Sequence, residues 1–193
     1  MNTVKLIALT GGIGSGKSCA LEIIQALGYK TLSSDAIVKE LYENIEVRKL
    51  LIPLFPTAVS GEDFILDKKA ISDLAFNDKS LHLALTELIT PMVIAEIFKR
   101  TANESGLVFV EVPLLFECEF TDMFDDVLVI VRDIDERIKS VIMRSNLTVE
   151  QVKARINNQF DYENSDLSSF TVIKNDGTKE MLKEKILLAI KEF

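Results

Sequence analysis

The sequence predicts an α/β fold in which a five-stranded, mostly parallel sheet has helices on both faces. Three observations favour this fold. Short apolar runs alternate with segments that have the apolar spacing of amphipathic helices, which is typical of parallel sheets with crossover helices. A glycine-rich loop joins the first apolar run to the first helical segment. The chain has 193 residues, 48% of them hydrophobic and 27% charged, so it can form one sizeable core.

The first strand, loop and helix come in the order that a phosphate-binding site needs. Residues 4–9 form an apolar run, and helical spacing that begins near Ala20 ends at Gly28, which can stop a helix. The loop fits the template of Gly, four residues, then Gly-Lys-Ser, with Gly11, Gly12, Ile13, Gly14, Ser15, Gly16, Lys17 and Ser18. In such a loop the amides bind phosphates, the lysine reaches the β- and γ-phosphates, and the final serine hydroxyl binds Mg²⁺. The motif predicts a P-loop NTPase-type fold that binds a nucleoside triphosphate.

Composition and charge exclude several other classes of protein. The net charge of −8 argues against extended binding to nucleic acid. Cys19 and Cys118 form no disulfide framework, and no Cys/His cluster has metal-ligand spacing. The single histidine, His82, is expected at the surface or in packing, because nothing near it in the sequence orients it as a base. No signal peptide precedes the first strand and no apolar run reaches the ~18 residues of a membrane span, so we expect a cytoplasmic protein without membrane contact.

Asp35 follows the second predicted strand, residues 29–32, after two serines. A short acid at the end of a strand in an open α/β sheet points toward the crevice in which ligands bind. The same Ser-Ser-Asp sequence can also start the helix whose apolar pattern resumes at Ile37. From the residues alone, Asp35 is equally a helix cap or a site acid.

The region from about residue 46 to 104 is predicted to be a mostly helical insertion between strands. A turn is expected at 61–63, and Asp67 can cap a helix. Thr90 and Pro91 have the form of an N-cap followed by proline at the first helical position, so a helix is expected to begin there. Such an insertion is the natural place for a substrate-binding subdomain.

Three further strands are predicted: one in the run 107–117, which leads into a site loop at Pro113, one at 127–131 and one at 169–174. A turn at 175–177 and a helix over 181–190 follow. Glu111 lies at the end of the first of these strands. An acid in an apolar run is costly to bury unless it is paired or faces a polar cleft. Glu111 is therefore a second acid that can face the site.

Residues 134–160 are predicted to form a helical hairpin, with Asp133 and Thr148 as caps of its two helices. Basic residues lie on or beside its first helix, namely Arg132, Arg137, Lys139 and Arg144. In an acidic protein this concentration suggests a lid that closes over phosphates. A solvated helix face is the alternative for any one of these residues.

Taken together, these residues resemble one family closely, the dephospho-coenzyme A kinases, which phosphorylate the ribose 3′-hydroxyl of dephospho-CoA with ATP. The resemblance covers nearly the whole chain, and the Val-Pro-Leu-Leu-Phe-Glu run at 112–117 is its most specific part. The other matching segments are residues 9–18, 35–38, 66–70, 76–78, 144–151, 155–156 with Gln159, and 172–177.

The resemblance implies a kinase with ATP and Mg²⁺ as cofactors and dephospho-CoA as the second substrate. It implies a core over residues 1–45, 105–133 and 165–193, a CoA-binding subdomain over about 46–104 and a lid over about 134–160. It also implies roles for single residues. Asp35 is the base, Lys17 and Arg144 neutralise phosphate charge, Ser18 binds the metal, and Asn175 belongs to the nucleotide site.

At three positions the chain departs from the family pattern. Ser33 stands where the family commonly has a further Asp, Thr90 where it commonly has His, and Glu111 where it commonly has Asp. These changes bear on substrate contacts and rate more than on the type of reaction. The alternatives are a P-loop kinase for a nucleoside monophosphate or another small alcohol, and a non-catalytic nucleotide-binding protein. A GTPase switch is disfavoured, because the sequence has no Asn-Lys-x-Asp and no Asp-x-x-Gly after a strand.

Overall fold

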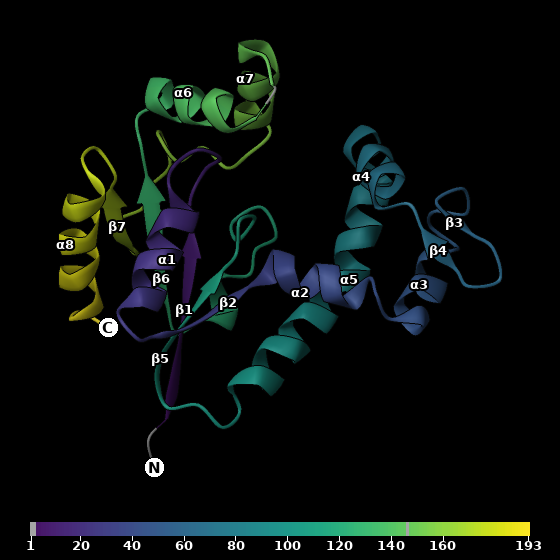
Figure 1. Cartoon of the computed structure of the whole chain (residues 1–193), viewed down its shortest axis with the longest axis horizontal. Helices are drawn as coiled ribbons and strands as arrows, with labels where there is room; N and C mark the ends of the chain where they lie inside the picture. The colour runs from purple at the N-terminus through teal and green to yellow at the C-terminus, as the bar shows by residue number, and fades with distance from the viewer. Residues whose placement is uncertain (1–2, 146) are drawn as a thin grey trace. The chain divides into compact units, whose positions relative to one another are not determined.

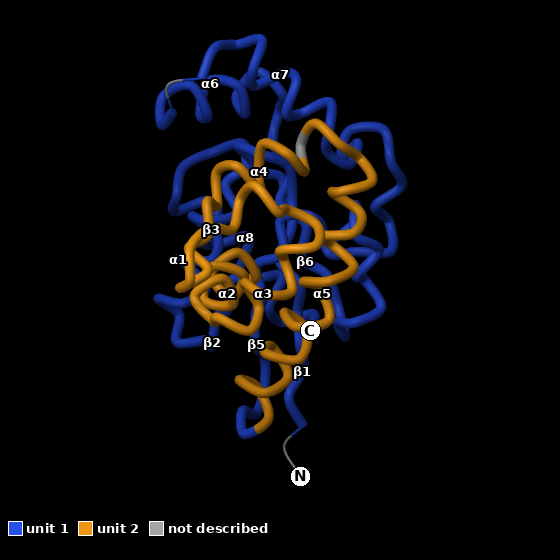
Figure 2. Tube along the Cα trace, turned by 90° about the vertical axis from the view of Figure 1, so that its right-hand side faces the viewer, with its two compact units in different colours: residues 1–33, 103–193 blue, residues 34–102 orange. Residues whose placement is uncertain are grey.

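The computed structural model divides the chain into two compact units (Figure 2). It describes residues 3–145 and 147–193, with the backbone alone at Phe76. Asn146 and the Phe76 side chain, which belong to the matching segments above, therefore lie outside the described residues. The first unit combines residues 1–33 and 103–193, and the second unit consists of residues 34–102.

The first unit is built on a five-stranded sheet in which every pairing is parallel. The strand order is β2-β5-β1-β6-β7, so that β1 lies in the centre (Figure 1). The strands are β1 (Val4–Thr10), β2 (Lys30–Ser33), β5 (Gly106–Glu111), β6 (Asp126–Val131) and β7 (Thr171–Lys174). A 3₁₀ turn, η1 (Thr121–Met123), precedes β6. The predicted α/β fold with a five-stranded parallel sheet is confirmed.

The central strand is buried on both of its faces. In β1 the consecutive residues Ile7, Ala8 and Leu9 are each 0% exposed, and successive side chains of a strand point to opposite faces of the sheet. On one face, α1 (Lys17–Ala26) and α8 (Lys179–Ile190) lie side by side and share an apolar cluster with Ile7 and Leu9 (Figure 1). This is why the strand sequence is a continuous apolar run and not an alternation.

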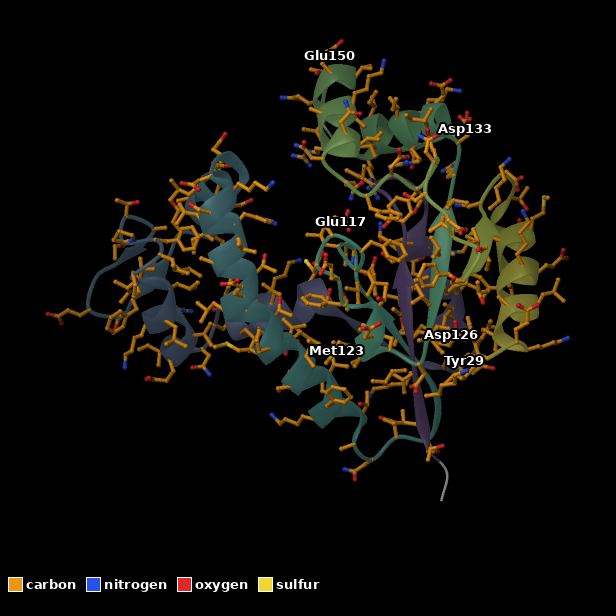
Figure 3. The ribbon with its side chains drawn as sticks, turned by 180° about the vertical axis from the view of Figure 1, so that it is seen from behind. Tyr29, Glu117, Met123, Asp126, Asp133 and Glu150 are labelled. Atoms are coloured by element: carbon orange, nitrogen blue, oxygen red, sulfur yellow. The ribbon has the colours of Figure 1, made fainter. Side chains whose placement is uncertain are left out.

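Helices α6 (Ile134–Arg144) and α7 (Val149–Asn157) form the predicted hairpin, beyond the end of β6 (Figure 1). Asp133, labelled in Figure 3 at the start of α6, accepts hydrogen bonds from the amides of the next turn. Thr148 and Gln151 form a capping box at the start of α7. The two helices are joined by a small apolar cluster of Ile138, Val141 and Val152. The caps predicted from the sequence are confirmed.

The second unit is mostly helical. Its helices are α2 (Ser34–Leu41), α3 (Ile45–Leu51), α4 (Lys68–Asn77) and α5 (Lys79–Thr101). Strands β3 (Val59–Ser60) and β4 (Ile65–Leu66), which the sequence pattern did not predict, form a short antiparallel hairpin around the expected turn. Asp67 accepts a hydrogen bond from the Ala70 amide and caps α4, as predicted.

The second unit begins at Ser34, whereas the insertion predicted from the sequence begins at about residue 46. The difference concerns α2, which packs against α5 of the second unit. Glu40 of α2 also forms an ion pair with Arg100 of α5. An amphipathic pattern shows that a helix has a buried face, but not which element covers that face, so the boundary could not be located from the sequence.

The prediction that a helix begins at Pro91 is wrong, because α5 runs without interruption from Lys79 to Thr101 and contains Pro91. Thr90 is therefore an interior residue and not an N-cap. Proline removes one helical hydrogen bond and crowds the preceding turn, but Ile89, Val93 and Ile97 are buried along α5, and their packing holds the helix together across it. The helix is capped at Asp78, whose carboxylate accepts from the amides of the first turn.

We expect that replacing Asp78 by alanine lowers the free energy of unfolding by about 1 kcal/mol, because the first amides of α5 lose their acceptor. Thr90→Ala should change it by no more than about 0.5 kcal/mol, as is usual away from caps and cores. Urea unfolding of both variants measures the difference, with Asp78→Ser as a control that retains a capping oxygen. A larger loss for Thr90→Ala than for Asp78→Ala would contradict the assignment of the cap.

By length and composition, α5 could cross a membrane, since an 18-residue window within it has a mean hydropathy of 1.6. The sequence of α5 contains no uninterrupted apolar run of that length, because polar residues such as Glu87 lie within it. Of that window, 17% is buried. A single such helix among the described residues is weak support for a span, because long core helices have the same composition.

Candidate active site

The loop between β1 and α1 turns sharply, and three of its glycines make the turn possible. Gly11, Gly14 and Gly16 have φ values of 146°, 77° and 103°, in the region that L side chains rarely adopt. The Ser15 amide donates to the Gly12 carbonyl oxygen at 3.1 Å and closes the turn. The loop therefore leads from the carboxyl edge of the sheet into the N-terminus of α1, where the helix dipole favours an anion.

Protein atoms also pack against the loop where its glycines lie. A Cβ atom at Gly12 would lie 2.6 Å from Cζ of Arg137, and one at Gly14 would lie 2.6 Å from the Arg137 carbonyl oxygen. A Cβ atom at Gly16 would collide with the side-chain amide of Asn175. The loop motif alone explains these glycines by backbone curvature and access for phosphates. The structure adds a second reason, because they also admit α6 and the segment after β7.

Polar groups of the loop lack partners within the described residues. The Ser15 hydroxyl is buried and has no hydrogen-bond partner there, and the amides of Gly14 and Gly16 have no acceptor there. Buried polar groups in native proteins are almost always paired. An anion with several oxygens satisfies donors of this kind, so the loop fits the triphosphate that the motif predicts.

Next to the loop lies a cavity of about 320 Å³. Its described lining residues are Gly14, Gly16, Lys17, Ser18, Cys19, Arg132, Ser140, Arg144, Asn175, Gly177, Lys179 and Leu182. Four of them are cationic and none is acidic, in a chain with a net charge of −8. The fold thus brings the predicted residues Lys17, Ser18, Arg144 and Asn175 together around one cavity that is suited to an anionic ligand.

Lys17 and Asn175 both contact the loop backbone. The Lys17 ammonium donates to the carbonyl oxygens of Gly11 at 2.6 Å and Gly12 at 3.1 Å. The Asn175 side-chain amide donates to the Ser15 carbonyl oxygen at 2.8 Å. Lys17 is thereby held at the loop, and Asn175 supports the loop from the end of β7.

The four basic residues predicted to form a lid do not share one environment. Arg144 and Arg132 line the cavity, and Nε of Arg132 is buried without a partner among the described residues. Arg137 lies against the loop instead, only 4% exposed, and burial lowers the pKa of its guanidinium. Lys139 is exposed and pairs with Glu136 at 2.7 Å. Only two of the four can meet a ligand in the cavity, so the solvated-face alternative holds for Lys139 alone.

Asp35 belongs to the second unit, and the cavity described above belongs to the first. It is the second residue of α2 and is exposed. Within the described part of the chain, no hydrogen bond or ion pair of its carboxylate is found. Asp35 therefore lies in the first turn of the helix, where a negative charge is favourable, and its carboxylate remains available to a ligand.

Ser18 is the residue of this site that fits a metal ion. Among the described residues, no group of three or more His, Cys, Asp or Glu side chains could hold a metal. Mg²⁺ in nucleotide sites commonly takes one or two protein ligands and completes its shell with phosphates and water. The Ser18 hydroxyl, in the first turn of α1 and on the cavity wall, fits a Mg²⁺ ion of this kind.

Two residues behind the loop were not assigned a role from the sequence. Gln159, noted only as part of the family resemblance, accepts a hydrogen bond from the Ile13 amide at 2.7 Å. Tyr162 is buried beside Thr10, 3.4 Å between the hydroxyls, and burial raises its pKa to about 12. Both contacts join residues more than 140 positions apart, so no local pattern could have indicated them.

The chain matches the family model described as Dephospho-CoA kinase over residues 5–180. The chain belongs to the dephospho-CoA kinase family. A family member from Thermus thermophilus, named dephospho-CoA kinase, is 35% identical over 186 residues, which make up 96% of this chain and 89% of that protein. The dephospho-CoA kinase of Carboxydothermus hydrogenoformans is 28% identical, with 100% of this chain and 96% of that protein covered. The protein is thus a phosphotransferase.

Solved structures agree with membership of the dephospho-CoA kinase family. TT1252 from Thermus thermophilus superposes with a TM-score of 0.87 at 34% identity, covering 97% of this chain and 96% of that one. A dephospho-CoA kinase from Campylobacter jejuni has a TM-score of 0.68 at 28% identity, covering 98% and 97%. A shikimate kinase from Acinetobacter baumannii, at 16% identity and a TM-score of 0.59, shares the fold alone.

Proposed function

We propose that the protein transfers the γ-phosphoryl group of ATP to the ribose 3′-hydroxyl of dephospho-CoA, forming coenzyme A and ADP. The observation that supports this most strongly is the cavity beside the phosphate loop, lined by Lys17, Arg132, Arg144 and Lys179, in a chain matched by the family over residues 5–180. Membership of this kinase family implies that ATP is the phosphoryl donor. We further propose that the reaction takes place in the cytoplasm.

In the proposed step, the acceptor oxygen forms a bond to the γ-phosphorus while the bond from that phosphorus to the β-γ bridging oxygen breaks. The hydroxyl proton passes to the Asp35 carboxylate, and the electron pair of the broken bond stays on ADP. Most of the rate enhancement in such reactions comes from positioning and charge neutralisation. Lys17, Arg144 and the loop amides supply both. A Mg²⁺ ion held at Ser18 would neutralise charge on the β- and γ-phosphates.

Asp35 is the proposed base because it closely follows the end of β2. In the sheet, Leu9 of β1 pairs with Glu111 of β5, which in turn pairs with Ser33 of β2. The ends of β1 and β2 are therefore level at the carboxyl edge, where ligands bind in open α/β sheets. Asp35 follows Ser33 by two residues, as Gly11 follows Leu9. We propose that the second unit supplies this acid and the acceptor-binding surface.

The phosphate acceptor is the part of this proposal that needs a direct test. We expect the purified protein with Mg-ATP to consume ATP rapidly in the presence of dephospho-CoA, and to release coenzyme A. Adenosine monophosphate and shikimate serve as controls for a nucleoside monophosphate kinase and for a kinase of another small alcohol. Preferential phosphorylation of either control would overturn the proposed acceptor, and ATP binding without turnover on any acceptor would indicate a non-catalytic nucleotide-binding protein.

Arg144 is expected to act mainly in the transition state. It lies at the end of α6 on the wall of the cavity, and an arginine that stabilises developing phosphoryl charge can contribute about 10³-fold or more to kcat. Arg144→Ala should therefore lower kcat far more than it raises the Kd for dephospho-CoA. Lys139→Ala, which removes an exposed charge from the same helix, should leave kcat unchanged. Equal kcat values for the two variants would assign Arg144 to the solvated surface.

A further inference from the structure

Ile13, near the tip of the phosphate loop, has both of its backbone polar groups bound by side chains of the 134–160 segment. Its amide donates to Oε1 of Gln159 at 2.7 Å, and its carbonyl oxygen accepts from Nε of Arg137 at 3.0 Å. Arg137 comes from α6, and Gln159 follows the end of α7. The two ends of the helical hairpin thus hold the same loop residue.

The side chain of Ile13 also packs against the helical hairpin. It lies against the apolar cluster of Ile138, Val141 and Val152, which joins α6 to α7. The flanking residues Gly12 and Gly14 leave room for this approach, because a Cβ atom at either position would collide with Arg137. Moving the hairpin away from the loop as a rigid body would break both hydrogen bonds and expose Ile13 to water, which is unfavourable.

Arg137 is an unusual residue to place at such a contact. Its side chain is 4% exposed, and burying a guanidinium is costly unless the group is well bound. Its surroundings include the charge of Glu163, and its Nε is used on the Ile13 carbonyl oxygen. A methionine or leucine would fill the space without that cost. Unlike an apolar side chain, the guanidinium gives this contact a direction, because its Nε donates to the Ile13 carbonyl oxygen.

The helix connects this contact to the cavity. Arg144 lies seven residues after Arg137 in α6, so the two side chains are two turns apart on nearly the same face, with about 10 Å between them along the axis. Arg144 lines the cavity, whereas Arg137 lies behind the loop. Because a helix of this length is stiff, fixing Arg137 at Ile13 also fixes the distance from the loop to Arg144.

We propose that Arg137 and Gln159 are positioning residues that hold Ile13, and thereby keep the phosphate loop and Arg144 in one fixed arrangement around the transferred phosphoryl group. In this arrangement the base of the hairpin does not open and close over the nucleotide. This inference rests on the proposed function, because it assigns Arg144 to the transferred phosphoryl group. The contact of Arg137 and Gln159 with Ile13, however, can be tested without any acceptor substrate.

A double-mutant cycle tests the coupling between Arg137 and Arg144. Arg137→Met should lower kcat by about tenfold or more, since misplacement by about 1 Å can cost about 10²-fold. Adding Arg144→Ala to Arg137→Met should then lower kcat by a much smaller factor than Arg144→Ala does in the wild type, because Arg144 is already misplaced. If Arg144→Ala lowers kcat by the same factor in the wild type and in Arg137→Met, Arg137 does not position Arg144 and the proposal is overturned.

Amide exchange at Ile13, followed by NMR on the full chain with and without ADP, tests the contact directly and does not depend on Arg137→Met folding. Gln159→Leu should accelerate exchange of the Ile13 amide proton at least about tenfold, because its acceptor is lost. Gln159→Glu, which keeps an acceptor oxygen, should restore slow exchange, and Lys153→Met on the outside of α7 is the matched control. Equal exchange rates of the Ile13 amide in Gln159→Leu and wild type would overturn the proposal that Gln159 holds Ile13. A wild-type protein that does not phosphorylate dephospho-CoA would overturn only the proposed function.

Discussion

Replacing Lys17 by alanine is expected to abolish phosphoryl transfer and to weaken ATP binding. The Lys17 ammonium lies against the carbonyl oxygens of Gly11 and Gly12 and on the wall of the cavity. From this position it can contact phosphate oxygens in both the bound substrate and the transition state. Losing a contact made in both states raises the Kd for ATP, and losing the part that strengthens in the transition state lowers kcat. Both effects are measured with purified variant, by calorimetric titration with ATP and by coenzyme A formation.

The control for this substitution is Lys183→Ala, which removes a charge from the exposed side of α8. It should leave both constants near those of the wild type. The melting temperature of the Lys17 variant should stay close to that of the wild type as well, because Lys17 is only partly buried and the loop has other supports, such as Asn175. Unchanged turnover in Lys17→Ala would show that the glycine-rich loop is not the phosphate site.

The elements of the sheet could be predicted because their signals are local. Residues of β1 form an apolar run because both faces of a central strand are covered. The first helix ends where Gly28 takes the left-handed conformation, with a φ of 92°. The caps at Asp133 and Thr148 are local as well, since each side chain bonds to amides of the turn that follows. A pattern that forms its own hydrogen bonds can be located from the sequence.

Elements that depend on distant packing could not be located in this way. Thr90-Pro91 has the sequence of a helix start, yet α5 continues through it because its buried face is held by the rest of the second unit. The β3–β4 hairpin is only two residues long on each strand, which is too short for a periodicity to show. Tertiary packing outweighs local preference in both cases.

The residues of the candidate site also fall into two groups, those that a local motif locates and those that only tertiary packing locates. Lys17 and Ser18, which the loop motif singles out, both line the cavity, because the motif itself sets the local geometry. The arginines of α6 could not be sorted from the sequence, since only the packing of α6 against the loop decides which of them face the cavity. Arg137 and Arg144 differ in this respect, although both lie on one helix. Lys179 on the cavity wall was missed, because a lysine at a helix start has no distinctive pattern.

Asp35→Asn is expected to lower kcat by about 10²–10⁴-fold, the range typical for loss of a general base. Asn keeps the shape of the side chain and its ability to accept hydrogen bonds in the first turn of α2, but it cannot take the proton of the acceptor hydroxyl. Because Ser33 replaces the neighbouring acid common in the family, no adjacent carboxylate can substitute, and the dependence on Asp35 should be sharp.

Folding and ATP affinity should stay near wild type in Asp35→Asn, because Asp35 is exposed and the phosphate loop lies in the other unit. Urea unfolding and ATP titration check these two points, and coenzyme A formation under saturating substrates gives kcat. Asp35→Glu is the matched variant that keeps the carboxylate, and it should retain more activity than Asp35→Asn. If Asp35→Asn keeps more than about a tenth of wild-type turnover, the loss lies below the range expected for a base. Asp35 then serves only the helix start, and Glu111, level with Ser33 and Leu9 at the carboxyl edge of the sheet, becomes the acid to replace next.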